Sequence, residues 1–95
     1  MRVRFFASLR NITGCVEEEI PYEETAGALA HSLCDRYGAK LRQKIFVVEG
    51  SGVEEEFSPE IIVLINGRHV SHLGGVAAPL NSNDRVDIFP MLAGG

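Results

Sequence analysis

The chain has 95 residues, nine of them basic and thirteen acidic, with a formal net charge of −4 and a pI near 5.3. A chain of this length folds around one core, and an apolar content of 45% is that of an ordinary folded domain. The basic residues are scattered, which argues against nucleic acid as a partner because phosphate binding needs a concentrated basic face. An acidic surface would suit a partner with a basic docking face, although mild acidity is also a common means of staying soluble.

Membrane insertion and disulfide bonding are not indicated. Apolar runs such as residues 61–65 are far too short to cross a bilayer, and Met1 leads directly into a strand-like segment without a signal peptide. We therefore expect a cytoplasmic protein of one domain, residues 1–95. Cys15 and Cys34 form neither a disulfide framework nor a zinc spacing, so both are expected as buried small apolar residues, with a redox or sulfur-handling role as the alternative.

The N-terminal residues predict a β-hairpin. Residues 2–7 alternate in the manner of a strand. One face should carry Val3, Phe5 and Ala7, and the other Arg4 and Phe6. A polar turn is expected over residues 8–14, followed by an antiparallel strand over residues 15–20 whose acidic triplet would blunt a sheet edge.

One long helix is expected after this hairpin. Thr25 is placed as an N-cap, and Leu29, Leu33 and Tyr37 recur at a spacing of four residues, which gives one apolar stripe. Gly38 fits the left-handed position that ends such a helix. The stripe must be buried against the sheet, so this helix should supply much of the core.

The following segment, residues 39–58, carries weaker signals. Leu41, Ile45 and Phe46 indicate a short second helical turn. Residues 47–48 suggest a brief extended piece, and residues 50–52 a loop.

A second hairpin is predicted next. Residues 61–65 are apolar on both faces, as in a central strand, and Asn66-Gly67 is a strong hairpin turn signal because both residues tolerate positive φ. Residues 68–70 would return as a short strand. His69 and His72 could be a metal pair, but they have no third ligand nearby, so we expect no metal site.

The C-terminal residues predict a loop, a last strand and a thin tail. Val76 and Leu80 should pin a glycine-rich loop to the core, and residues 86–89 alternate as a strand that Pro90 ends. Residues 91–95 should then leave the sheet as a flexible arm. The two terminal glycines would let that arm enter a narrow channel, and a frayed tail without function is the alternative.

These elements together predict an α+β fold. A mixed sheet would hold the first and last strands side by side and parallel at its centre, with the helix across one face. On strand alternation, the face opposite the helix should then present Phe6, Ile62, Leu64 and Phe89. We expect this face to dock partners, and the alternative is that residues 39–58 fold over it.

Several segments resemble the MoaD/ThiS group of ubiquitin-like sulfur carriers, over nearly the whole chain and in the same order. The matching segments are residues 5–10, residues 65–68, Pro79-Leu80, residues 88–90 and residues 93–95. The pattern is closest to the MoaD branch, the small subunit of molybdopterin synthase. Its most specific parts are the Phe89-Pro90 step and the terminal Gly94-Gly95.

The resemblance implies a β-grasp fold with four to five strands and one main helix. It implies a sulfur carrier that is not itself an enzyme and binds no cofactor: an ATP-dependent MoeB/ThiF-like adenylyltransferase would activate the Gly95 carboxyl, which would then accept sulfur as a thiocarboxylate. Ala93 and Gly94 would thread into a MoaE-like large subunit, which would supply the catalytic residues for molybdenum or tungsten cofactor synthesis. Pro90, Met91 and Leu92 would join the docking face.

Two features depart from the family pattern. Met91 and Leu92 stand where the family often has a second proline and a valine, and residues 39–58 are longer than compact members need. The exact partner therefore stays open. A ubiquitin-like modifier joined to lysines through Gly95 and a thiamin-pathway carrier are the related alternatives, and a plain interaction module is a third.

Overall fold

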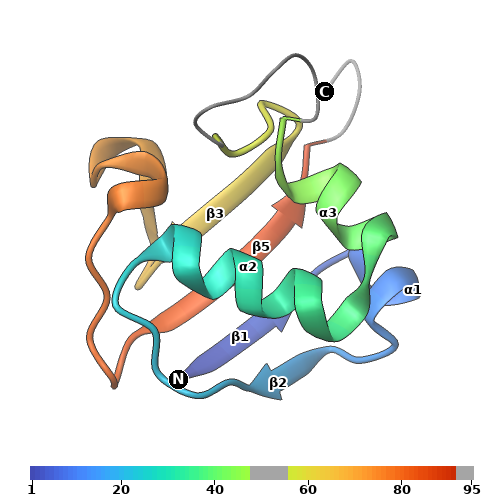
Figure 1. Cartoon of the computed structure of the whole chain (residues 1–95), viewed down its shortest axis with the longest axis horizontal. Coiled ribbons are helices and arrows are strands. Elements are labelled where there is room, and N and C mark those ends of the chain that lie inside the picture. Colours follow the sequence, from blue (N-terminus) through green and yellow to red (C-terminus); the bar gives the residue numbers. More distant parts are fainter. Residues whose placement is uncertain (48–55, 92–95) are drawn as a thin grey trace.

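The structure is a computed structural model that describes residues 1–47 and 56–91. The described part holds a five-stranded mixed sheet with helices on one face (Figure 1). The strands are β1 (Arg2–Phe5), β2 (Glu17–Glu19), β3 (Ile61–Ile65), β4 (Arg68–His69) and β5 (Arg85–Pro90). The helices are α1 (Leu9–Thr13), α2 (Ala26–Tyr37) and α3 (Ala39–Ile45), with the 3-10 helices η1 (Val70–His72) and η2 (Gly75–Ala77).

The sheet has the order β2-β1-β5-β3-β4, which confirms the predicted arrangement. β1 and β5 are parallel and occupy adjacent interior positions, and each remaining pair is antiparallel. The first and last strands of the chain therefore lie side by side under the main helix. This is the topology of a β-grasp fold.

The core lies between the sheet and the helices α2 and α3, which cover the same face (Figure 1). By strand alternation six strand residues lie on the helix side of the sheet, and all six are buried there: Val3, Phe5, Val63, Ile65, Val86 and Ile88. α2 contributes Leu29 and Leu33, and α3 contributes Leu41 and Ile45. Val76 packs against this core and Leu80 is buried in it, so the long loop is pinned as expected.

The ends of α2 follow from Thr25 and Gly38. The Thr25 Oγ1 accepts a hydrogen bond of 3.1 Å from the Ala28 amide, as an N-cap does. Gly38 has the positive φ expected at the other end, 92°, but its ψ of −169° lies outside the left-handed helical region. That extended ψ lets Gly38 end α2 and begin α3 directly.

The predicted turn over residues 8–14 is wrong, because Leu9–Thr13 form the helix α1. Leu9 is buried and Ile12 packs against the core, so a spacing of three residues stabilises this short helix. Gly14 closes it at φ 75°. The placement of Ala7 on the buried face is also wrong: β1 ends at Phe5, and Ala7 is exposed at φ 54° where the chain turns away.

The second hairpin and the segment around α3 follow the predictions in their described parts. Asn66 and Gly67 both have positive φ, at 51° and 85°, and the returning strand is one residue shorter than expected because Val70 begins η1. Beyond α3, the Val47 amide donates to the Glu56 carbonyl at 2.9 Å. The predicted loop over residues 50–52 lies outside the described residues.

The expected burial of the cysteines is confirmed for Cys34, whereas Cys15 is half-buried. Its Sγ lies 3.4 Å from the Tyr37 hydroxyl, which also donates to Glu18. Burial, and then the hydrogen bond to Cys15, raise the pKa of Tyr37, so this hydroxyl stays protonated. No helix in the described part of the chain is long and apolar enough to cross a membrane.

The close packing of α2 on η2 depends on Gly27. A Cβ at this position would lie 2.9 Å from the Val76 carbonyl oxygen and 3.1 Å from the Val76 Cβ. Gly→Ala in a helix normally stabilises by about 0.5–1 kcal/mol, but the clash should outweigh this gain. We expect Gly27→Ala to lower the free energy of unfolding by about 1–3 kcal/mol, the cost of overpacking. Urea unfolding measures it, with Ser32→Ala on the same helix as control; a more stable Gly27→Ala protein would contradict the prediction.

Candidate partner-docking face

The side of the sheet opposite α2 and α3 is called the open face here and is formed by Arg4, Phe6, Ile62, Leu64, Asp87 and Phe89. Its four apolar members are those predicted from strand alternation, and all four are half-buried. Phe89 on β5 pairs with Ile62 on β3, and its ring stacks on that of Phe6 at 4.1 Å between centroids and 11° between planes. The structure thus brings these side chains together as one apolar patch.

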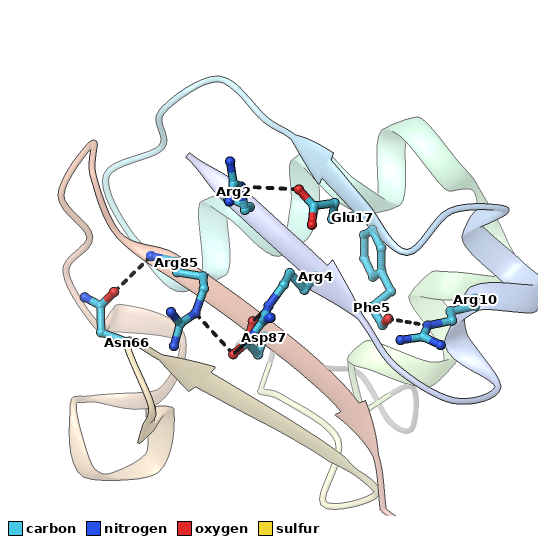
Figure 2. Close-up of polar contacts among 8 residues, drawn as sticks. All are labelled: Arg2, Arg4, Phe5, Arg10, Glu17, Asn66, Arg85 and Asp87. Atoms are coloured by element: carbon cyan, nitrogen blue, oxygen red, sulfur yellow. Dashed lines mark hydrogen bonds and ion pairs between the residues drawn. The ribbon is translucent and has the colours of Figure 1, made fainter.

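Two arginines of this region lie over the ring of Phe6. The guanidinium carbons of Arg4 and Arg10 lie 5.4 and 5.5 Å from the centroid of the Phe6 ring. The Arg10 Nε donates to the Phe5 carbonyl at 2.9 Å, which anchors it at the end of β1 (Figure 2). Cation–π contacts of this kind hold the aromatic pair in place and give it a positively charged rim.

The open face is not apolar throughout, because Asp87 stands in its middle. The Asp87 side chain is 6% exposed and accepts two hydrogen bonds from Arg4, Nε to Oδ1 at 2.7 Å and Nη2 to Oδ2 at 3.0 Å (Figure 2). Arg85 Nε approaches the same carboxylate at 3.4 Å. The hydrogen bond from Arg4, and then the positive charges of both arginines, hold the pKa of Asp87 below its ordinary value against the opposing effect of burial.

The Arg4–Asp87 pair predicts a pH-dependent contribution to stability. Since the pKa of Asp87 is lowered in the folded state, its stabilisation is present above the unfolded pKa and is lost as pH falls through the folded pKa. We expect Asp87→Asn to cost about 1–2 kcal/mol at neutral pH, a value kept low because Arg4 is 37% exposed. Urea unfolding from pH 7 to pH 2 should show the gap between the two proteins closing below about pH 4. If the difference in unfolding free energy between the two proteins did not change with pH, the charge of the Asp87 carboxylate would not be the cause of the stabilisation.

The described residues on either side of residues 48–55 lie away from the open face. α3 packs against α2 and α1, and Phe46 is buried between His31 of α2 and Phe57. The Ser58 amide donates to the Ile45 carbonyl, which holds the segment around Ser58 against the end of α3. The alternative in which residues 39–58 fold over the open face lies, for residues 48–55, outside the described part of the chain.

The start of the tail is fixed by β3. Pro90 pairs with Ile61, so the strand ends at Pro90 as predicted. Met91 does not yet leave the sheet, because its amide donates to the Glu60 carbonyl at 2.7 Å, although the residue is 53% exposed. The further residues assigned to docking, threading and modification, namely Leu92, Ala93, Gly94 and Gly95, lie outside the described residues.

The two histidines considered as metal ligands are 6.2 Å apart between ring centroids. His69 Nδ1 accepts a hydrogen bond from the Ser71 amide and so caps η1. Within residues 1–47 and 56–91, no group of three histidine, cysteine or acidic side chains is placed to hold a metal ion.

Sequence reasoning missed Arg10, Asp87 and Arg85 as members or neighbours of the open face, and placed Arg4 there without a role. A signal was present: Arg4 and Asp87 each alternate with apolar residues on the two strands that were predicted to lie side by side. Parallel pairing in that register puts Arg4 directly opposite Asp87. The open face is therefore an aromatic patch joined to an ion-pair cluster.

The fold and this face define a small ubiquitin-like protein of the β-grasp class, with an aromatic patch beside the strand that leads into the C-terminal tail. The sequence profile described as the ThiS family matches residues 3–95. The chain belongs to this family of ubiquitin-like carriers and modifiers, which confirms the resemblance read from the sequence.

Three relatives show the range of the family. Small archaeal modifier protein 3 of Haloferax volcanii is 34% identical, and the match covers 100% of this chain and 98% of that protein. The solution structure of small archaeal modifier protein 1 from Methanosarcina acetivorans is 32% identical with a TM-score of 0.83, covering 99% of this chain and 94% of that one. A putative molybdopterin converting factor, subunit 1, from Pyrococcus furiosus is 28% identical with a TM-score of 0.70, covering 96% and 95%.

Proposed function

We propose that this protein is a sulfur carrier, the small subunit of a molybdopterin synthase, which carries sulfur as a thiocarboxylate on Gly95. The observation that carries the proposal is the half-buried, stacked Phe6–Phe89 pair, because Phe89 lies on β5, the last strand before the terminal glycines. Aromatic residues of this kind are enriched where partners dock. The Pyrococcus furiosus relative, by its title a subunit of a molybdopterin converting factor, supports the pathway.

The proposed chemistry begins with activation of a poor electrophile. The Gly95 carboxylate attacks the α-phosphorus of ATP on a MoeB/ThiF-like enzyme, and pyrophosphate leaves. The terminal sulfur of a donor persulfide then attacks the acyl carbon and AMP leaves. A thiol reduces the resulting acyl disulfide, which yields the thiocarboxylate on Gly95 and a disulfide on the donor.

The catalytic groups for these steps belong to the partners. In this proposal the chain itself binds neither ATP nor a metal and is not an enzyme. The tail delivers sulfur to a pterin precursor inside a MoaE-like large subunit, and the open face holds the carrier against each partner in turn. We place this work in the cytoplasm, where ATP is available.

A second candidate function is conjugation to proteins, favoured by the two relatives that are named small archaeal modifier proteins. In that route a lysine amine attacks the activated Gly95 acyl group, and an isopeptide bond forms. A thiamin-pathway sulfur carrier is a further variant, which would share the thiocarboxylate but deliver it to a different acceptor.

One incubation separates the routes. The protein is combined with ATP, a persulfide donor and the activating enzyme of the same cell, in the presence of cell extract. A sulfur carrier gains the mass difference between sulfur and oxygen on its C-terminal peptide, and a molybdopterin synthase large subunit then consumes it. High-mass conjugates on a denaturing gel would favour the modifier. A chain left unchanged by every activating enzyme of that cell would refute both.

A further inference from the structure

The charges on and around the open face are arranged in rows across the sheet. The first row holds Glu19, Arg2 and Arg85, and the second holds Glu17, Arg4 and Asp87. The aromatic pair follows: Phe6 comes two residues after Arg4, just past the end of β1, and Phe89 comes two residues after Asp87 on β5. At the usual rise of a strand, the first charged row therefore lies about 13 Å from the aromatic pair, with the second row between them.

Each carboxylate in these rows is already paired within the protein. Glu17 lies 3.3 Å from Arg2, and Glu19 lies 2.8 Å from the N-terminal ammonium group, which lowers the pKa of Glu19. Asp87 is shared by Arg4 and Arg85 (Figure 2). The cluster of Arg4, Arg85 and Asp87 holds two guanidinium groups and one carboxylate, so it has one positive charge in excess.

Arg10 adds a second positive charge, because its Nε is bound to a neutral carbonyl group. The two rows and Arg10 together are therefore positive, within a chain whose formal charge is −4. The expectation that an acidic protein should dock on a basic partner thus does not describe this face. Arg85 is 48% exposed, and a guanidinium group has five donors, so it can bind a carboxylate of a partner while it stays near Asp87.

We propose that the open face recognises a partner surface on which carboxylates border an apolar socket. The socket would take the Phe6–Phe89 pair, and the carboxylates would pair with Arg85 and its neighbours. The inference rests on the proposed function, and the occupant it commits to is the activating enzyme. Charge pairs at the rim of an interface act mainly on the association rate, so docking should weaken as salt rises.

The test is the rate of adenylation by the activating enzyme of the same cell, followed as pyrophosphate release at low and high salt. We expect Arg85→Glu to lower kcat/KM about tenfold at low salt and about twofold at high salt. Arg85→Lys should restore most of the rate, because it restores the charge. Arg36→Glu is the matched control: it makes the same charge change at an exposed site on α2, and it should stay within about twofold of the parent protein.

Thermal melting followed by circular dichroism checks that each variant is folded. An equal loss in Arg85→Glu and Arg36→Glu, or a loss that does not depend on salt, would overturn the acidic-partner inference while the proposed function stands. A parent protein that is not adenylated at all would overturn both.

Discussion

Removal of Gly95 should abolish adenylation and thiocarboxylate formation, with a loss of activity beyond about a thousandfold. The reason is chemical: the shortened chain ends on the Gly94 carboxyl, one residue short of the position where the activating enzyme must hold the reacting atom. A misplacement of 1 Å at a reacting centre can already cost about a hundredfold in rate. Pyrophosphate release and the mass of the C-terminal peptide measure the two steps separately.

The control for this deletion keeps the tail length. Ala93→Gly leaves the terminal glycine in place and adds no bulk, so its kcat/KM should stay within about threefold of the parent protein. Ala93→Trp should be as inactive as the deletion if the tail threads a narrow channel. An active Ala93→Trp protein would show that the channel is wide, and an active Gly95 deletion would remove the proposed site of modification.

Phe89→Ser should reduce kcat/KM for adenylation about thirtyfold, with little loss of stability. Phe89 is half-buried and stacks on Phe6, so the substitution removes the centre of the aromatic patch and leaves the buried face of β5 intact. Aromatic residues at the centre of an interface commonly contribute 2 kcal/mol or more, which corresponds to about thirtyfold. Saturation curves against the activating enzyme measure the effect.

Val16→Ser provides the comparison for Phe89→Ser. Val16 is 53% exposed and lies outside the open face, so an apolar side chain is lost in both proteins. The rate with Val16→Ser should match the parent protein. Equal losses in the two variants would show that docking does not use the open face, and a large loss of stability in Phe89→Ser would assign this residue a structural role instead.

Most of the fold could be predicted because its strongest signals are local and agree with one another. Three signals agree on a single helix with the bounds of α2: the N-cap Thr25, the apolar stripe of Leu29 and Leu33, and the terminating Gly38. Asn66 and Gly67 fix the second hairpin by their positive φ. Alternation on β1, β3 and β5 then assigns each side chain to a face, which is why the four apolar residues of the open face were predicted correctly.

The polar part of the open face was harder to predict because it depends on strand register. Asp87 was not assigned a role from the sequence, because only the parallel alignment of β1 and β5 places it against Arg4. α1 was missed for a different reason: a helix of five residues shows no period, and Leu9 and Ile12 are its only apolar pair. Tertiary packing, not propensity, stabilises such short helices.

The most direct test of the account uses a chain whose Gly95 carboxyl is replaced by a carboxamide. This change removes the nucleophilic oxygen and leaves every other atom of the tail and the open face in place. With the activating enzyme and ATP, we expect ATP–pyrophosphate exchange with the natural carboxyl terminus and none with the amide. Equal exchange with both chains would contradict the claim that the protein works through its C-terminal carboxylate.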